Sequence, residues 1–493
     1  MKLTVIGGGG FRVPHVASVF QEGSPVQLDE LCLYDVDSGR LAVMRNVLDQ
    51  LGMSAAIGAV TVTTSLEEAV SSADYVFAAM RVSGVCGRVI DEHEALSRGL
   101  LGQETVGIAG YAYALRQIPE ALRLARAVAA LAPQAWVLNF TNPAGIITQA
   151  MRTVYPRVIS ICDTPIGMVR HAIHVLGLNE SETTYDYVGL NHLGWLRTMV
   201  CDGVDHLPRL LADDGLLMRM EEAQVIGADW IRALGYLPNE YLYYYYKNRE
   251  IVHRLRQGET RGEFLAKQQG RFYAAADAAP DQAGRLWLAA DTERDATYMA
   301  EARDAGQERA DEGIDIGGYP RVARDLMNAL SNGTDSRLMI LGVGNADADD
   351  VGEAGLLIPQ LRADAIVEVP CTADANGIHS QRPALVTGPE LGLITAVKAC
   401  EELVIDAAIE GDQQIAWQAR WPVIRSWTPW MWPARCSRPT CGRTRILRGC
   451  SPSAPGPLGG PGTLSASRAR CQPAGRVVNQ PGAASRPGAR HKT

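Results

Sequence analysis

The stretch Lys2-Leu3-Thr4-Val5-Ile6-Gly7-Gly8-Gly9-Gly10 decides the fold of this chain. Apolar and β-branched residues run directly into four glycines, and a helix is predicted to follow over residues 13–22. A buried parallel strand has this composition, and glycines let the backbone turn sharply and approach a diphosphate at the N-terminus of a helix. The stretch therefore predicts a strand, a tight turn and a helix that open a nucleotide-binding unit.

A second predicted strand, Leu31-Cys32-Leu33-Tyr34, ends at the acidic sequence Asp35-Val36-Asp37. A carboxylate at that distance from the glycines is placed to accept hydrogen bonds from an adenosine ribose. A glycine run alone is more often a simple turn, but the combination favours dinucleotide binding. The cofactor site is therefore assigned to Gly7, Gly8, Gly9, Gly10 and Asp35.

Strand and helix patterns alternate through the first part of the chain. Strands are predicted at residues 60–64, 74–80, 135–140 and 157–162, and a long helix over residues 111–131. This alternation is typical of a Rossmann-like, doubly wound parallel sheet in the α/β class. Beyond about residue 200 the patterns become mostly helical, which predicts a C-terminal α+β lobe. We expect a dinucleotide-binding domain over residues 1–195 and a second domain over residues 196–425.

The composition excludes several classes of protein. With 47% hydrophobic and 21% charged residues it is that of an ordinary globular chain, and the formal net charge of −8 argues against a general nucleic-acid binder. No apolar run is long enough to span a membrane, and the N-terminus has the pattern of a strand rather than of a signal peptide. We therefore expect a cytoplasmic protein with no membrane partner.

Residues 426–493 differ sharply from the rest of the sequence. They contain ten Arg and one Lys but no Asp or Glu, together with ten Pro and nine Gly. Such a stretch cannot bury enough apolar surface to become ordered. One interpretation is a basic tail for RNA or acidic surfaces. The preferred one is a disordered, non-native end such as a shifted reading frame, because the change is abrupt and falls inside an apparently helical region.

Three predicted strands end in polar sequences that carry candidate chemistry. These sequences are Asn139-Phe140-Thr141-Asn142-Pro143, Cys162-Asp163-Thr164-Pro165 and Gly189-Leu190-Asn191-His192. In open parallel sheets ligands bind outside the carboxyl ends of the strands, which is where we expect these residues to lie. Cys162 and His192 suit a borderline divalent metal ion. Taken without that setting, they read as a buried structural cysteine and a core histidine.

The ordered set of motifs resembles glycoside hydrolase family 4, the NAD-dependent and divalent-metal-dependent glycosidases. The resemblance rests on Gly7–Gly10, Tyr34-Asp35-Val36-Asp37, Gly102-Gln103-Glu104-Thr105 and the three polar strand ends, and it runs to about residue 425. Within the family, Asn239-Glu240-Tyr241-Leu242-Tyr243-Tyr244 resembles the 6-phospho-β-glucosidase branch.

The resemblance implies a reaction that does not use the paired carboxylates of most glycosidases. NAD accepts a hydride from C3 of the sugar, a base removes the acidified C2 proton, and the leaving group departs from C1 by elimination. Water then adds and the hydride returns. A divalent metal, with Mn²⁺ as the first choice, stabilises the enolate. The implied partner is a small phosphorylated glycoside, and the implied assembly is a dimer or tetramer of identical chains. The resemblance also implies that residues 1–195 are the NAD-binding domain and that residues 196–425 form a substrate lobe, the substrate, metal and oligomerisation domain.

The resemblance also implies roles for individual residues. Cys162 and His192 match metal ligands, Tyr241 matches the C2 base, and Asn139 and Asn142 match residues that hold the nicotinamide ribose or sugar hydroxyls. Arg261 and Arg88 match cations for the 6-phosphate, and Glu104 is placed near the metal or the cofactor. The alternatives from the residues alone are turn capping for the two asparagines, surface positions for the arginines and an aromatic packing face for residues 241–246.

Asp163 departs from the expected branch. The β-acting branch commonly carries Asn after the cysteine, whereas the α-acting branch carries Asp there as the acid for the leaving group. Asp163 is therefore a second candidate catalytic residue, and three other functions stay open: an α-acting glycosidase, one that acts on unphosphorylated substrates, and a plain NAD-dependent dehydrogenase. A non-catalytic nucleotide-binding protein is disfavoured by Cys162, His192 and Tyr241 together.

Overall fold

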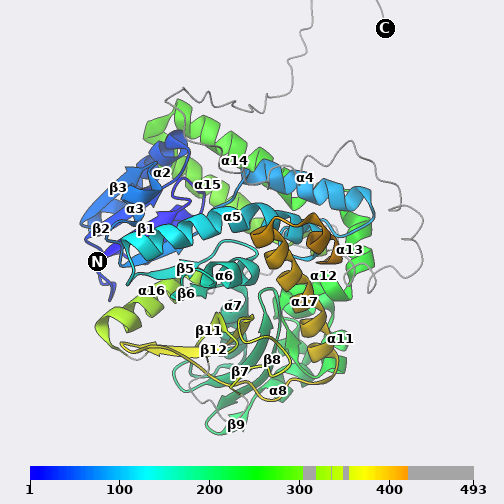
Figure 1. Ribbon diagram of the computed structural model, residues 1–493. Helices are drawn as coiled ribbons and strands as arrows, with labels where there is room; N and C mark the ends of the chain where they lie inside the picture. Colours follow the sequence, from blue (N-terminus) through cyan, green and yellow to red (C-terminus); the bar gives the residue numbers. More distant parts are fainter. Residues whose placement is uncertain (304–317, 335, 348–354, 420–493) are drawn as a thin grey trace, which may run out of the picture. The chain divides into compact units, whose positions relative to one another are not determined.

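A computed structural model describes residues 1–303, 318–334, 336–347 and 355–419 of the chain. Its strands form one mixed sheet in the order β10-β8-β7-β12-β11-β6-β5-β4-β1-β2-β3 (Figure 1). The described residues cluster as one compact unit. No described helix is long and apolar enough to cross a lipid bilayer. The predicted tail, residues 426–493, lies outside the described residues, so its predicted disorder stays a prediction.

The N-terminal half of the sheet is parallel, as the sequence predicts. It consists of β1 (Lys2–Ile6), β2 (Glu30–Tyr34), β3 (Ala59–Thr63), β4 (Tyr75–Ala78), β5 (Trp136–Asn139) and β6 (Val158–Ser160). Alternate side chains enter two separate hydrophobic cores: Leu3 and Val5 lie in one core, whereas Ile6 lies in the other. Burial on both faces explains why these strands are almost uniformly apolar.

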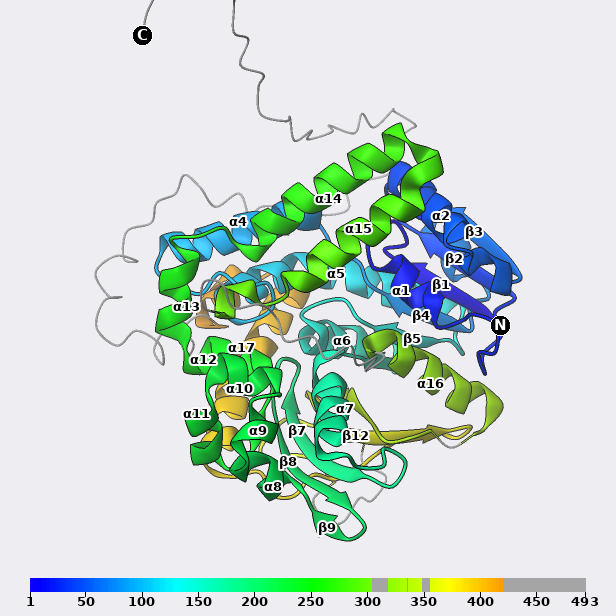
Figure 2. The same cartoon turned by 180° about the vertical axis from the view of Figure 1, so that it is seen from behind.

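Helices cover both faces of this parallel half, and the views from opposite sides show the two layers (Figures 1 and 2). One core includes residues of α1 (Val13–Ser18), α2 (Ser38–Gln50), α7 (Thr164–Leu176) and α16 (Gly318–Asn332). The other includes residues of α3 (Leu66–Val70), α5 (Gly107–Leu131), α6 (Ala144–Arg152) and α17 (Gly388–Glu410). The remaining helix of this half is α4 (Gly84–Ser97), which contacts α5. The doubly wound prediction is confirmed.

The first helix is shorter than predicted. It was expected over residues 13–22, but α1 ends at Ser18, after which Phe20 N donates to Ala17 O and the Phe20 side chain is buried. This turn lets the chain bury the Phe20 ring. In a straight helix over residues 13–22, the helical period would determine the direction of the ring instead.

The C-terminal part of the sheet is antiparallel, and this corrects one expectation. Its strands are β7 (Thr184–Leu190), β8 (Leu193–Cys201), β9 (Val204–Asp205), β10 (Leu237–Pro238), β11 (Met339–Gly344), β12 (Ile366–Asp374) and β13 (Gly377–Ser380). β7 is hairpin-paired with β8 and meets β12 antiparallel at a single residue pair, Gly189 with Glu368. The third polar sequence is therefore a hairpin turn, not the carboxyl end of a parallel strand.

The remaining helices surround the antiparallel strands and close over the N-terminal half. They are α8 (Leu207–Ala212), α9 (Asp214–Leu217), α10 (Glu221–Ile226), α11 (Ala228–Leu234), α12 (Tyr243–Tyr246), α13 (Asn248–Leu255), α14 (Arg261–Ala278) and α15 (Ala283–Ala296). Both α14 and α15 pack against α2, so chain from beyond residue 260 covers the nucleotide-binding unit (Figure 2). β8 crosses the expected boundary at residue 195, and the two-domain division stays a prediction.

Candidate functional site

The glycine-rich turn after β1 has the tight geometry that a diphosphate requires. Gly7 adopts a positive φ of 90°, a conformation that side chains disfavour. A Cβ on Gly9 would lie 2.8 Å from Cβ of Arg40 and 3.0 Å from Oδ2 of Asp35. The N–H groups of Gly7 and Gly8 donate to Tyr34 O, and Gly10 N donates to Gly7 O. The turn is thus anchored to β2 and has no room for side chains.

Asp35 lies at the end of β2, directly beside this turn. Its Oδ2 accepts from Gly9 N at 3.1 Å and its Oδ1 accepts from Asp37 N at 3.0 Å. Asp37 in turn caps α2 by accepting from Arg40 N. The half-buried Asp35 carboxylate is therefore fixed in direction, and each oxygen retains a lone pair for a ribose hydroxyl.

The two asparagines after β5 behave differently from each other. Asn139 is fully buried, and its Nδ2 donates to Thr141 O, Ala144 O and the Thr148 hydroxyl. Its side chain braces its own loop, which matches the turn-capping alternative rather than direct contact with a cofactor. Asn142 is half-buried and begins a cis peptide bond to Pro143, at the start of α6.

Cys162 and Asp163 follow β6 at the N-terminus of α7. The Cys162 thiol is buried, and burial raises its pKa well above the usual value, with the Asp163 and Glu368 charges adding to the effect. Asp163 Oδ2 pairs with Nη1 of Arg12 at 3.4 Å. Arg12 follows the glycine-rich turn in the chain, so it connects the cofactor turn with the strand end that carries Cys162.

His192 is held in a defined tautomer by two residues of the Gly102–Thr105 motif. Its Nδ1 lies 2.7 Å from the Thr105 hydroxyl, which itself donates to Oε1 of Gln103 at 3.1 Å. Since a hydroxyl has one proton, Thr105 must accept from Nδ1–H, and Nε2 keeps a free lone pair. Burial lowers the pKa of His192 to about 4, against the Asp163 and Glu104 charges. This neutral imidazole is ready to bind a cation.

Asn191 fixes the hairpin turn that carries His192. Its Oδ1 accepts from Ala144 N at the start of α6, and its Nδ2 donates to Glu368 Oε1 at 3.0 Å. The antiparallel hairpin therefore places His192 beside the strand ends of the parallel half. His192 has a φ of 63°, which the tight turn imposes.

Tyr241 completes the group formed by Cys162 and His192. Its ring stacks on the His192 imidazole at a centroid distance of 3.8 Å, and the Cys162 and Asp163 charges both act on its hydroxyl. Burial raises the pKa of Tyr241 above its usual value. Tyr243 and Tyr244 are buried in the main core, so the packing alternative holds for that part of the aromatic run.

The donor set suits a divalent cation that also binds its substrate. Cys162 and His192 offer one sulfur and one nitrogen ligand, and substrate oxygens would have to complete the shell. Among described residues, the only group of three ligand atoms within 4.8 Å of one another is Glu182, Cys201 and Asp202, a different part of the chain. The protein alone thus supplies an incomplete shell at Cys162 and His192.

Arg88 lies in a buried ion-pair network with Glu104. Arg88 binds Glu92 at 2.6 Å and also Glu104, which Arg81 contacts as well. Burial acts to raise the pKa of Glu104, but Arg81 and Arg88 hold it at about 2. Glu104 lies between Gln103 and Thr105 in the sequence. The ion-pair network is therefore next to Thr105, whose hydroxyl contacts Nδ1 of His192.

Arg261 is the first residue of α14 and faces the end of α15. Its guanidinium donates to Thr297 O, the Thr297 hydroxyl and Arg294 O at 2.7–3.1 Å. Burial, together with the nearby Arg12 and Arg261 charges, lowers the pKa of Arg294 to about 9. Arg12, Arg261 and Arg294 therefore form a cationic group that the sequence prediction covered only through Arg261.

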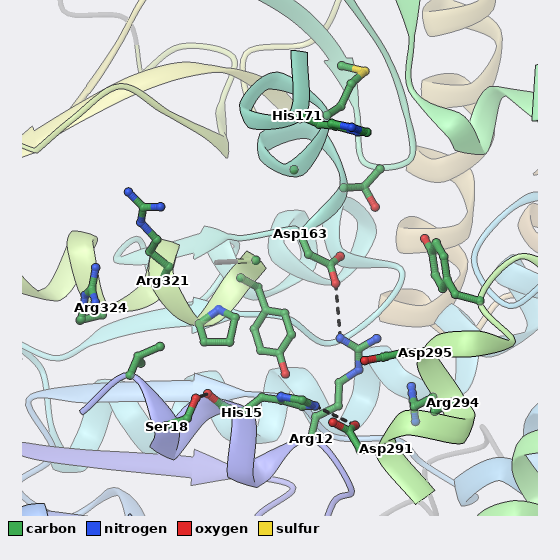
Figure 3. Close-up of a pocket in the computed structure, with 18 of the residues that line it drawn as sticks. Arg12, His15, Ser18, Asp163, His171, Asp291, Arg294, Asp295, Arg321 and Arg324 are labelled. Carbon is green, nitrogen blue, oxygen red and sulfur yellow. Dashed lines mark hydrogen bonds and ion pairs between the residues drawn. The ribbon is translucent and has the colours of Figure 1, made fainter. Parts of the chain in front are cut away.

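A cavity of 820 Å³ opens beside Asp163 (Figure 3). Arg12, Arg294 and Asp163 line it, and a dashed line marks the pairing of Arg12 with Asp163 (Figure 3); its lining also includes Glu240 and Tyr298. Arg321 and Arg324 of α16 and His171 of α7 line its other parts. Sequence reasoning missed the cavity residues apart from Asp163. The one available signal was the position of Arg12 next to the glycines.

Two models of one family match the chain. The model "Family 4 glycosyl hydrolase" matches residues 2–178, and "Family 4 glycosyl hydrolase C-terminal domain" matches residues 187–420. Among curated proteins, 6-phospho-alpha-glucosidase 1 of Lacticaseibacillus paracasei is 28% identical to this chain, and the match covers 85% of this chain and 91% of that protein. The 6-phospho-beta-glucosidase of Escherichia coli is 33% identical over 51% of this chain and 59% of its own.

Solved structures share the fold. A 6-phospho-alpha-glucosidase from gut microorganisms in complex with NAD and glucose-6-phosphate has a TM-score of 0.68 at 28% identity, with 85% of this chain and 92% of that chain covered. The 6-phospho-beta glucosidase from Thermotoga maritima with manganese, NAD⁺ and glucose-6-phosphate has a TM-score of 0.69 at 24% identity, with the same coverage.

Proposed function

This chain belongs to glycoside hydrolase family 4, and we propose that it hydrolyses 6-phospho-β-glucosides with NAD and a divalent metal, Mn²⁺ being the first choice. The observation that carries the proposal is the group of Cys162, tautomer-defined His192 and stacked Tyr241. Relatives that act on phosphorylated glucosides support the substrate class.

The glycine-rich turn fits the cofactor. The space beside Gly9 is too small for a Cβ, the turn leads into α1, and Asp35 stands beside it with a free lone pair on each oxygen. When bound, NAD would accept a hydride from the sugar and later return it, and the metal would stabilise negative charge on the sugar oxygens. Structures of relatives that contain NAD and manganese support both groups.

Within this site the chain's own residues bind, orient and move protons. Cys162 Sγ and His192 Nε2 would hold the cation, while Thr105 keeps the imidazole in the required tautomer. Tyr241 would remove the C2 proton. Since burial, together with the Glu240, Asp163 and Cys162 charges, raises the pKa of Tyr241, the phenol needs a neighbouring cation to act as a base at neutral pH.

Arginines would neutralise the phosphate. Arg88 and Arg261 stay our candidates, but each already has partners: Arg88 pairs with Glu92 and Glu104, and Arg261 donates to Thr297 and Arg294. A phosphate at either residue would therefore share it with these groups or displace them. Asn142, half-buried at the end of β5, is proposed to bind a sugar hydroxyl.

The β preference rests on the segment of residues 239–244, which resembles the β-acting branch. Asp163 Oδ2 is paired with Nη1 of Arg12 at 3.4 Å, so Arg12 already holds one oxygen of this carboxyl group. Asp163 would then orient a hydroxyl or the cation. Relatives of both specificities match, so an α-acting enzyme is the second candidate, favoured by Asp163 itself. We also propose a homodimer or tetramer and a cytoplasmic location.

The test compares hydrolysis of p-nitrophenyl β-glucoside 6-phosphate, its α-anomer and the unphosphorylated β-glucoside. Each is measured with NAD⁺ and Mn²⁺ under reducing conditions, and then with either one omitted. Release from the phosphorylated β-substrate alone, lost without either group, is expected. Preference for the α-anomer would show that the enzyme acts on α-glucosides rather than β-glucosides. Net reduction of free NAD⁺ would indicate a dehydrogenase instead.

A further inference from the structure

Glu240, the residue before Tyr241, presents a buried carboxyl group to the cavity. Glu240 is only 6% exposed and lines the same cavity as Asp163. Its Oε1 accepts from the Tyr298 hydroxyl at 3.1 Å, and a hydrogen bond also connects Tyr298 with Tyr241. Glu240 is therefore held in place by the residue that also contacts the candidate base.

The surroundings of Glu240 are acidic rather than basic. Glu221 and Glu222 of α10 face it, Asp163 faces it from α7, and Tyr298 faces it from the segment after α15. Arg303 pairs with Glu221 at 2.6 Å, and the arginines that line the same cavity as Glu240 are Arg12, Arg219, Arg294, Arg321 and Arg324. In the described part of the chain, Glu240 has no ion pair of its own. Burial, with the Glu221 and Asp163 charges, raises the pKa of Glu240 to about 8, so its carboxyl is protonated at neutral pH.

We infer that Glu240 is the proton donor to the leaving-group oxygen, with the leaving group in the cavity that Glu240 and Asp163 line. This inference rests on the proposed glycosidase function. Glu240 presents to the cavity a buried carboxyl group without an ion pair among the described residues, whereas the Asp163 carboxyl group is paired with Arg12. A buried carboxylic acid with a raised pKa is suited to this role in other glycosidases.

The proton that Glu240 donates is recovered later in the same reaction. As the C1–O bond breaks, the proton of the Glu240 carboxyl moves to the departing oxygen, which leaves as a neutral alcohol, and Glu240 becomes a carboxylate. When water adds at C1, Glu240 takes one proton from that water as the new C1–O bond forms. The carboxyl is then restored for the next turnover, in the manner of general acid–base catalysis.

The first test is the leaving-group dependence of Glu240→Gln, whose amide oxygen can still accept from Tyr298. With a methyl glucoside 6-phosphate, which needs protonation, kcat should fall at least about 100-fold. With the p-nitrophenyl substrate, whose leaving group needs no proton, it should fall less than about threefold. Equal losses on both substrates would overturn the inference, because they would indicate a structural role.

Controls separate this inference from the proposed function. Glu222→Gln changes a neighbouring buried carboxyl in the same cavity and should leave the ratio of the two substrates unchanged. Exchange of the C2 proton with deuterated water, followed by NMR, should persist in Glu240→Gln. If Asp163→Asn rather than Glu240→Gln gave the leaving-group pattern, Asp163 would be the donor. If the wild type hydrolysed neither substrate, the proposed function itself would be wrong.

A second test needs no cofactor or substrate. Infrared spectra of the ligand-free protein should contain the C=O band of a protonated carboxyl at pH 7, which disappears as the pH passes about 8 and is missing in Glu240→Gln. Glu222→Gln identifies any overlapping band. A wild-type spectrum without a band that Glu240→Gln removes would overturn the inference whatever the kinetics.

Discussion

At the scale of single residues, Thr105 and Arg12 decide what their neighbours can do. The Thr105 hydroxyl donates its only proton to Gln103 and so accepts from Nδ1–H of His192, which leaves Nε2 of His192 with a free lone pair. Arg12 reaches from the glycine-rich turn to Asp163 while its guanidinium lies over the Phe140 and Tyr319 rings, at 5.4 and 5.3 Å. Thr105 and Arg12 are not proposed to bind substrate themselves. Each contacts a residue of the proposed site: Thr105 contacts His192, and Arg12 contacts Asp163.

Replacement of Thr105 by Val should weaken metal binding. The isosteric change removes the acceptor of His192 Nδ1–H, so the imidazole loses its orientation and tautomer preference. Mn²⁺ affinity, measured by electron paramagnetic resonance of the free ion in the presence of NAD⁺ and glucose 6-phosphate, should fall by about 10- to 100-fold. Thr292→Val, an exposed threonine of α15, should change nothing. Unchanged affinity in Thr105→Val would remove His192 from the metal site.

Replacement of Glu368 by Gln should change how stability depends on pH. Burial raises the pKa of Glu368 from 4.5 to about 7, so the folded state holds a proton that the unfolded chain has released, and the group's stabilising contribution is lost as the pH rises from 4.5 to 7. The variant should match the wild type near pH 4.5 and exceed its free energy of unfolding by up to about 3 kcal/mol above pH 7. Urea unfolding measures both.

The matched control for this prediction is Glu410→Gln, an exposed carboxyl at the end of α17. It should leave the difference from the wild type flat across the same pH range. A Glu368→Gln variant that is less stable than the wild type at pH 8 would show that the Glu368 carboxylate, through its contact with Asn191, stabilises the hairpin turn instead.

At the scale of elements, the site is built where two turns of different kinds meet. One is the turn from β1 to α1, which needs glycine because the backbone of β2 and β4 lies against it. The other is the β7–β8 hairpin turn, which Asn191 ties to the N-terminus of α6. Parallel strands supply the first turn and antiparallel strands supply the second.

Replacement of Gly9 by Ala should weaken NAD binding at least about tenfold, which corresponds to about 1.4 kcal/mol. The new Cβ would lie 2.8 Å from Arg40 Cβ and 3.0 Å from Asp35 Oδ2, so the turn and the carboxylate would both have to move. Titration calorimetry with NAD⁺ measures the loss. Gly270→Ala, at an open position of α14, should bind NAD⁺ normally. Normal binding by Gly9→Ala would place the cofactor elsewhere.

At the scale of the whole molecule, helix α17 is part of the core beneath the site. Cys400, Val404 and Ile405 of α17 are buried among residues of α5 and α6. α17 also carries Lys398, which is buried and pairs with Glu401 at 2.6 Å. Helix α17 therefore completes the layer that covers one face of the parallel strands.

A chain that ends after residue 419 should keep the melting temperature and NAD affinity of the full chain. A chain that ends after residue 387 lacks α17 and should unfold at a clearly lower temperature or fail to fold, because it exposes the core shared with α5 and α6. Thermal unfolding with and without NAD⁺ distinguishes the two. A loss of stability in the longer chain would give residues 420–493 a structural role.

The local pattern of the sequence was enough for the parallel half of the fold and for the cofactor turn. Strand alternation, the glycines and Asp35 act through neighbours that are close in sequence, and steric limits on the backbone leave few other solutions for them. The family resemblance added Cys162, His192 and Tyr241, and His192 and Tyr241 are indeed stacked.

Only the tertiary structure decided which charges stand opposite one another. In the structure β7 is antiparallel rather than parallel, and the Asn139 side chain forms its hydrogen bonds within its own loop. Asp163 is paired with Arg12, and Glu240 is buried beside Tyr298. The proton carried by a buried group depends on desolvation and on charges from elements far away in the sequence. No periodicity in a single chain records those distances. The candidate base Tyr241 and one candidate acid, Asp163, could therefore be named from the sequence, whereas Glu240 could not.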